Sequence, residues 1–208
     1  MAYSIGIDSG STATKGILLA DGVITRRFLV PTPFRPATAI TEAWETLREG
    51  VETTPFLTLT GYGRQLVDFA DKQVTEISCH GLGARFLAPA TRAVIDIGGQ
   101  DSKVIRLNED GSVKNFVMND KCAAGTGRFL EMMAKTMEMS LDELSQVGLS
   151  YQEDITISSM CTVFAESEVV SLIAQNKHTD DIVHGLNKAV AAKTASLVKR
   201  VGGEEAYM

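Results

Sequence analysis

The 208-residue sequence lacks the features of several protein classes. No apolar run reaches the roughly 18 residues that a membrane-spanning helix requires, so we expect no membrane partner. Lysine and arginine form no stripe interleaved with aromatic residues, and the net charge is −6, which argues against a nucleic-acid partner. The first ten residues, MAYSIGIDSG, are typical of a strand and not of a signal peptide. These absences predict a cytoplasmic protein.

Cysteine is also scarce, since the chain has only Cys79, Cys122 and Cys161. An odd number of cysteines cannot all pair within one chain, and a reducing cytoplasm disfavours disulfides. No C-x-x-C motif is present, which excludes a zinc ribbon. The thiols are therefore expected to be free, catalytic or bound to metal.

Two common nucleotide motifs are missing as well. Neither G-x-x-x-x-G-K-[ST] nor G-x-G-x-x-G occurs, which disfavours a P-loop NTPase and a Rossmann enzyme. The chain has an internal repeat instead. IDSGSTATK (Ile7 to Lys15) and IDIGGQDSK (Ile95 to Lys103) share the pattern I-D-x-G-x-x-x-x-K at an offset of 88 residues.

Both copies occur in the same predicted surroundings. Each follows an apolar strand, continues into a second strand, reaches an Asp-Gly turn and ends in a third extended run, which predicts two three-stranded antiparallel meanders. FLTLTG and VTEIS are predicted as further strands, each followed by a short helix. Helical spacing of apolar residues predicts four longer helices, at Pro36–Gly50, Gly127–Glu138, Thr162–Gln175 and Thr179–Val201.

The repeated hairpins carry residues suited to phosphate. Small residues let backbone N–H groups approach phosphate oxygens. Asp8 and Asp96, at strand ends, can hold Mg²⁺ largely through water, and Lys15 can balance phosphate charge. One copy alone would be interpreted as a tight hairpin. Two copies in the same strand context favour a cleft with one phosphate loop on each wall.

This arrangement resembles the superfamily of acetate and sugar kinases, heat-shock chaperones and actin. The resemblance implies an α/β fold of two ribonuclease-H-like domains, residues 1–90 and 91–208, with ATP, or ADP after hydrolysis, and Mg²⁺ in a cleft between them. It implies catalytic roles for Asp8, Asp96 and Gln100. The other residues implied to bind ATP and Mg²⁺ are Gly10, Ser11, Thr12, Lys15, Gly98, Gly99 and Asp101.

Two cysteines occupy matching positions at predicted helix starts. NDKCAAGTGRFLE and SSMCTVFAESEVVSLIA each place a cysteine, Cys122 or Cys161, just before a helix with an apolar face. A helix N-terminus carries unpaired N–H groups and partial positive charge, which stabilise a thiolate, a phosphate or an anionic cluster. Two ligands cannot close a metal site alone, but a two-fold dimer would bring four thiolates together. The alternative is that both are small buried residues.

Six segments together carry a closer resemblance over nearly the whole chain: GIDSGSTATKGILL, TGYGR, DKQVTEISCHGLGA, VIDIGGQDSKVI, NDKCAAGTGRFLE and SSMCTVFAESEVVS. They resemble the ATPase activators (component A) of 2-hydroxyacyl-CoA dehydratases and the ATPase subunits of benzoyl-CoA reductases. The resemblance implies a homodimer with one bridging 4Fe–4S cluster, ligated by Cys122 and Cys161 of each chain. ATP hydrolysis would drive a low-potential electron, supplied by a ferredoxin or flavodoxin, into a partner dehydratase or related reductase.

The resemblance also leads to expectations about Cys79 and about the length of the second domain. Cys79 is not implied as a cluster ligand, and we interpret it as structural. Members of the family continue for several dozen residues beyond the KRVGGEEAYM that ends this chain, so we expect an incomplete second domain. Two alternative functions remain: a small-molecule kinase of the same fold with inert cysteines, and a non-enzymatic ATP-binding module.

Overall fold

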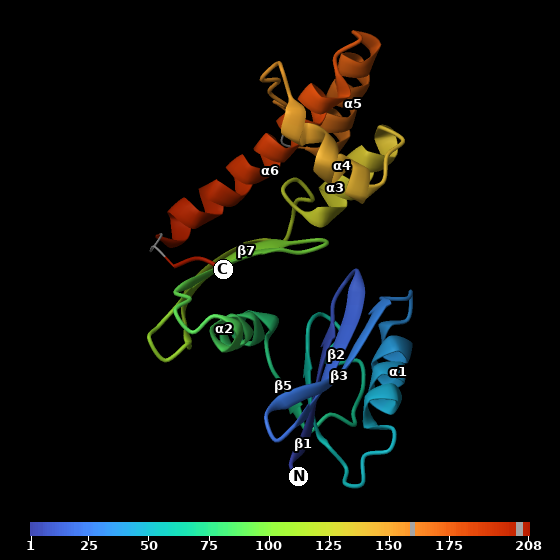
Figure 1. The fold of residues 1–208 in the computed structure, drawn as a ribbon, viewed down its shortest axis with the longest axis vertical. Coiled ribbons are helices and arrows are strands. Elements are labelled where there is room, and N and C mark those ends of the chain that lie inside the picture. The colour runs from blue at the N-terminus through green and yellow to red at the C-terminus, as the bar shows by residue number, and fades with distance from the viewer. Residues whose placement is uncertain (159–160, 203–205) are drawn as a thin grey trace. The chain divides into compact units, whose positions relative to one another are not determined.

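Each copy of the repeated motif begins a separate sheet. The computed structural model describes residues 1–158, 161–202 and 206–208. They form two units, unit 1 (Met1–Phe86) and unit 2 (Leu87–Met208), each with its own strands and helices (Figure 1). Within the described ranges, no helix combines the length and the apolar character needed to cross a membrane.

Unit 1 contains a five-stranded sheet of order β3-β2-β1-β4-β5. The first three strands form the predicted antiparallel meander, and β4 and β5 continue the sheet in parallel. The strands are β1 (Tyr3–Ser9), β2 (Ala13–Ala20), β3 (Val23–Pro31), β4 (Phe56–Thr60) and β5 (Lys72–Gln73).

One helix covers one face of this sheet. Helix α1 (Pro36–Arg48) begins with proline in its first turn, where a missing N–H costs nothing. Its buried residues recur at helical spacing and pack on alternate residues of β1 and β4. The fully buried contacts include Ile5, Ile7, Ile40, Leu57 and Leu59. Asp8, between Ile7 and Ser9, therefore projects from the opposite face of β1.

Unit 2 repeats the meander with β6 (Ala93–Ile97), β7 (Ser102–Leu107) and β8 (Val113–Asn119). The register irregularity of the first meander, at Leu18/Leu19, recurs 88 residues later at Arg106/Leu107. Tyr207 forms a parallel bridge to Ala93, on the edge of β6 that corresponds to the β4 edge of β1. The predicted internal repeat is therefore confirmed in the hydrogen-bonding pattern.

Helices make up the remainder of unit 2: α3 (Gly127–Thr136), α4 (Leu141–Val147), a 3₁₀ turn at Gly148–Ser150, α5 (Thr162–Ala174) and α6 (Thr179–Val201). The core joins α3, α5 and α6 through Phe129, Met133, Val169, Ile182 and Leu186. The other end of α6 packs on β7, where Leu197 and Val201 contact Val104. The predicted helix spans are confirmed to within two residues, and the methionines of α3 belong to the core.

Two local predictions were wrong, and one helix was not predicted. VTEIS is not a strand, because the Thr75 hydroxyl accepts the Ser78 N–H at 3.4 Å and helix α2 (Glu76–Leu87) begins there. Residues 61–70 form turns and bends in place of a short helix. Helix α4 was missed, although Ser140 and Glu143 form a capping box that is visible in the sequence.

Asp181, near the start of α6, accepts hydrogen bonds from the segment before α5. The backbone N–H groups of Glu153 and Gln152 donate to its Oδ1 at 2.9 and 2.6 Å, and they lower the pKa of the Asp181 carboxyl. A lowered pKa in the folded state gives stability that is present above the unfolded pKa, about 3.9, and is lost as pH falls through the folded value.

We therefore expect Asp181→Asn to lower the urea midpoint near neutral pH. The difference from the wild type should shrink as pH falls from about 5 to about 2. Asp180→Asn, on the same helical turn, serves as the control because it keeps both bonds to Asp181. A difference that stays constant across this pH range would contradict the assigned role of the carboxylate.

Candidate functional site

The turn between β1 and β2, residues 9–13 and here called loop 1, carries an exposed ion pair. Asp8 and Lys15 lie directly opposite each other on the two strands. Their Oδ2 and Nζ atoms are 3.1 Å apart, and the side chains are 26% and 51% exposed. The Gly10 N–H donates to the Ala13 carbonyl at 3.2 Å, which closes the turn. Lys15 is accessible to an anionic ligand at this turn.

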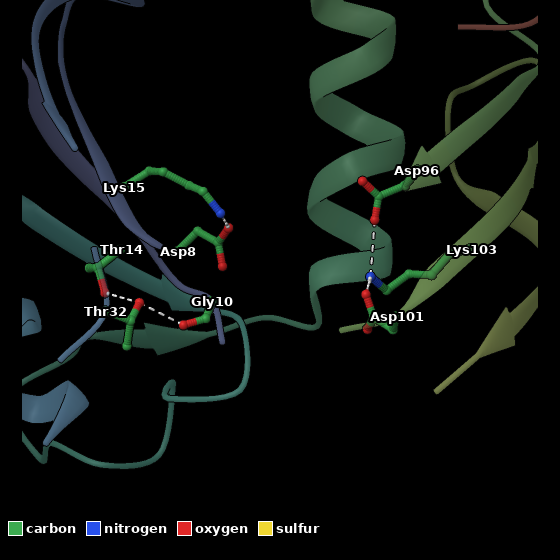
Figure 2. A network of polar contacts seen from close by, with 8 residues as sticks. All are labelled: Asp8, Gly10, Thr14, Lys15, Thr32, Asp96, Asp101 and Lys103. Carbon is green, nitrogen blue, oxygen red and sulfur yellow. Dashed lines mark hydrogen bonds and ion pairs between the residues drawn. The ribbon is translucent and has the colours of Figure 1, made fainter. Parts of the chain in front are cut away.

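Polar contacts from Thr32, the residue after β3, support loop 1 on one side. The Thr32 hydroxyl donates to the Gly10 carbonyl at 2.8 Å and lies 3.0 Å from the Thr14 hydroxyl (Figure 2). The Thr32 N–H donates to the Thr12 carbonyl at 2.9 Å. The backbone of the turn is thus held from outside, while Thr12 itself is exposed.

The segment TGYGR braces loop 1 on another side. The Gly63 N–H donates to the Ser9 carbonyl at 3.0 Å. A Cβ atom at Gly63 would collide with the Ser9 side chain, and one at Gly61 would collide with the Asp8 carboxylate. Gly61 also has φ +83°, a conformation that favours glycine. The sequence alone predicted no role for TGYGR. Its contact with loop 1 explains its two glycines.

The turn between β6 and β7, residues 97–101 and here called loop 2, has the same register with a different charge arrangement. Asp96 lies opposite Lys103, and the Gly98 N–H donates to the Asp101 carbonyl at 2.8 Å. Lys103 Nζ lies 3.0 Å from Asp96 Oδ2 and 2.7 Å from Asp101 Oδ1, and only 3% of its side chain is exposed (Figure 2). Gln100 is exposed in this turn. Sequence reasoning did not assign Lys103 to the site, although the shared lysine of the repeat was the available signal.

Loop 2 is bonded directly to the start of α3. The Gly127 and Arg128 N–H groups donate to the Gly98 and Gly99 carbonyls at 2.8 and 2.9 Å. This corrects the expectation that the α3 N-terminus is open to an anion, because its first donors are already used by loop 2. The helix start serves to fix loop 2 in place.

The segment that carries Cys122 is fastened at both sides. The Asn119 side chain donates to the Cys122 and Ala124 carbonyls at 2.8 and 3.2 Å. The Ser102 hydroxyl, next to loop 2, donates to the Gly125 carbonyl at 2.5 Å. Side chains from β8 and β7 therefore hold the segment between Asn119 and Gly125 in one conformation.

Cys122 and Cys161 both belong to unit 2. Cys161 directly precedes α5, whereas residues 123–126 separate Cys122 from Gly127, where α3 begins. Cys122 is half-buried, and Cys161 is exposed at the N-cap of α5 without a side-chain capping bond. Helices α3 and α5 share a core, and the Thr136 hydroxyl donates to Glu166 at 3.1 Å. Apart from residues 159–160 and 203–205, no group of three or more His, Cys, Asp or Glu is arranged to hold a metal ion. Neither thiol forms a disulfide, and the described part of one chain does not complete a metal site around them.

Cys79 lies in the first turns of α2, within unit 1. It lines a cavity of about 240 Å³ together with Gly6, Thr58 and the Asp8–Lys15 pair. The cavity lies at the face of the sheet that α1 leaves uncovered. Cys79 is a free, half-buried thiol.

Comparison with known proteins places these features in a family. The BadF/BadG/BcrA/BcrD ATPase family matches residues 5–208. The uncharacterized protein YjiL of Escherichia coli K12 is 71% identical over 207 residues, which cover 98% of this chain and 80% of YjiL.

Two solved structures are also similar. An activator of the 2-hydroxyisocaproyl-CoA dehydratase from Clostridium difficile, with bound ADPNP, is 44% identical with a TM-score of 0.89, over 99% of this chain and 78% of that one. Component A of the Acidaminococcus fermentans (R)-2-hydroxyglutaryl-CoA dehydratase is 44% identical with a TM-score of 0.91, over 100% of this chain and 82% of that one. The mixed α/β fold is therefore that of actin-like ATPase activators.

The glycine contact beneath loop 1 gives a stability prediction. We expect Gly61→Ala to lower the free energy of unfolding by about 1–3 kcal/mol, because alanine is strained at positive φ and its methyl group would meet Asp8. Gly83→Ala is the matched control, since a Cβ there meets open space on helix α2. Urea unfolding measures both variants. If Gly61→Ala is as stable as Gly83→Ala, TGYGR does not brace loop 1.

Proposed function

The chain belongs to the BadF/BadG/BcrA/BcrD ATPase family, and on that premise we propose that it is an ATP-dependent electron-transfer activator of a 2-hydroxyacyl-CoA dehydratase or a related reductase. One observation carries the proposal. Loop 2, a candidate phosphate loop, is hydrogen-bonded to the first residues of α3, only a few residues after Cys122. A nucleotide at loop 2 would therefore act close to a candidate cluster ligand.

Loops 1 and 2 fit ATP with Mg²⁺. Gly10, Gly98 and Gly99 have no side chain, so a phosphate can approach the backbone of both turns. Lys15 can reach phosphate from its exposed position. The Asp8 and Asp96 carboxylates, each about one-quarter exposed, are suited to hold Mg²⁺ largely through water. Gln100 is accessible for orienting an attacking water. In this proposal units 1 and 2 correspond to the ATPase domains predicted at 1–90 and 91–208.

Cys122 and Cys161 fit an iron–sulfur cluster shared by two chains. Neither forms a disulfide, and they precede two helices of one packed unit, so two chains related by a two-fold axis would supply four thiolates. A 4Fe–4S cluster held by four thiolates supplies one-electron transfer at low potential. The proposed partners are a ferredoxin or flavodoxin as donor and the dehydratase as acceptor. The relatives' activating role supports the dehydratase as partner.

The chain's own residues provide a route from phosphate to thiol. The Gly98 and Gly99 carbonyls hold the start of α3, and Ser102 and Asn119 hold the carbonyls of the cysteine segment. Backbone bonds link loop 2 to the start of α3, and side-chain bonds link β7 and β8 to the cysteine segment. In this proposal a change in loop 2 that accompanies phosphate binding is passed to the cysteine segment through these bonds.

The cluster assignment is tested by cysteine substitution. We expect Cys122→Ser or Cys161→Ser to abolish the visible iron–sulfur absorption of anaerobically purified protein, because a hydroxyl replaces a thiolate ligand. Cys79→Ser should keep it. Iron analysis should give about two irons per chain, since one four-iron cluster serves two chains. A colourless, metal-free protein that phosphorylates a metabolite would support the kinase alternative instead.

The coupling between the loops and the cluster is tested by chelation. We expect ATP with Mg²⁺ to change severalfold the rate at which a chelator removes iron from the dimer. Asp8→Asn or Asp96→Asn should remove this response and leave the cluster bound. Asp110→Asn, in the distant β7–β8 turn, is the control for loss of one carboxylate. Chelation rates that ATP leaves unchanged in the wild type would refute nucleotide-gated exposure.

A further inference from the structure

We propose that Lys103 is an internal counter-ion that keeps a divalent cation out of loop 2 until the nucleotide brings one. The inference rests on the proposed function, in which loop 2 takes ATP with Mg²⁺. It concerns a buried lysine that the family comparison leaves without a role, and it follows from a difference between the two copies of one hairpin.

The two hairpins have the same backbone arrangement. In each, an aspartate lies opposite a lysine seven residues later, Asp8 with Lys15 and Asp96 with Lys103. In each, a glycine N–H donates to a backbone carbonyl across the turn, Gly10 to Ala13 and Gly98 to Asp101. Differences between the two lysines therefore come from the neighbouring side chains and not from the strand register.

One substitution between the copies changes the charge balance. Loop 1 has Ala13 where loop 2 has Asp101, at the same offset of 88 residues. Asp101 is buried, and its Oδ1 lies 2.7 Å from Lys103 Nζ, closer than the 3.0 Å from that nitrogen to Asp96. The second acid therefore draws the ammonium inward and holds it between two carboxylates (Figure 2).

The two lysines consequently have different exposure. Lys15 makes one ion pair and is 51% exposed, so it can turn toward a ligand. Lys103 makes two ion pairs and is 3% exposed, so it cannot leave without exposing or abandoning both acids. The first lysine is suited to contact phosphate, and the second is suited to remain in place.

Lys103 sets the charge that loop 2 presents to a cation. Asp96, Asp101 and Lys103 together carry a net charge of −1, whereas the two acids alone would carry −2. Two carboxylates within reach of one ammonium have the oxygen ligands that a hard divalent cation prefers. The fixed ammonium contacts one oxygen of each carboxylate and repels a second cation. ATP phosphates add negative charge and so restore the attraction for Mg²⁺.

The test is a titration of the nucleotide-free protein with Mn²⁺, followed by electron paramagnetic resonance, with Mg²⁺ as competitor. We expect the nucleotide-free wild type to bind no Mn²⁺ at loop 2. Asp96→Asn should therefore leave the Mn²⁺ binding of the protein unchanged. Lys103→Met should create one, with affinity at least about tenfold higher than the wild type, because one repelling charge is gone. Adding Asp101→Asn to Lys103→Met should remove the gain. Lys15→Met should gain much less, since loop 1 has no second acid.

Two results would overturn the proposal. One is a nucleotide-free wild type that already binds Mn²⁺ at a site lost in Asp96→Asn. The other is a folded Lys103→Met variant, checked by circular dichroism, that binds Mn²⁺ no more tightly than the wild type. If Lys103→Met does not fold, Lys103→Gln replaces it because the amide keeps donors between the acids, and the wild-type titration remains decisive. The titration uses neither cluster nor dehydratase, so failure of the proposed function leaves its outcome unchanged.

Discussion

The two backbone hydrogen bonds from Gly127 and Arg128 to Gly98 and Gly99 are the constraint on which unit 2 depends. They satisfy the first donors of α3, which would otherwise require solvent or a capping side chain. They also explain the small residues at the contact, because a Cβ at Gly127 would lie 3.3 Å from the Gly98 carbonyl oxygen. The glycine-rich sequence after Cys122 thus reflects close packing of a helix start against a loop.

In unit 1, loop 1 is also held by a backbone N–H group from another segment of the same unit. There the Gly63 N–H, from a turn segment and not from a helix, donates to the Ser9 carbonyl behind loop 1. In both units a loop with exposed polar residues rests on backbone donors supplied from elsewhere in that unit. Loops held in this way keep their geometry without a ligand, which reduces the entropy that binding must overcome. The asymmetry lies in the charges, since Asp101 in loop 2 replaces Ala13 of loop 1.

Hydrogen bonds and helix packing within unit 2 also set the positions of the two cysteines. Cys122 is placed by bonds that begin in loop 2 and β8, and Cys161 is placed by the packing of α5 against α3. Loop 2 and the two thiols therefore belong to one packed unit. In the described residues of a single chain no third His, Cys, Asp or Glu completes a metal site around the thiols, and the proposed cluster therefore uses cysteines from two chains.

The sequence by itself determined the repeat, the two meanders and the longer helices, because period, turn residues and apolar spacing are local properties that survive in the fold. It also indicated the aspartates and glycines of both loops. Only the tertiary structure decided that Gly61 and Gly63 brace loop 1, that the first donors of α3 are used by loop 2, and that Lys103 is buried while Lys15 is exposed. These features depend on which distant groups meet and on how much water remains around them, and a residue pattern along the chain carries neither quantity.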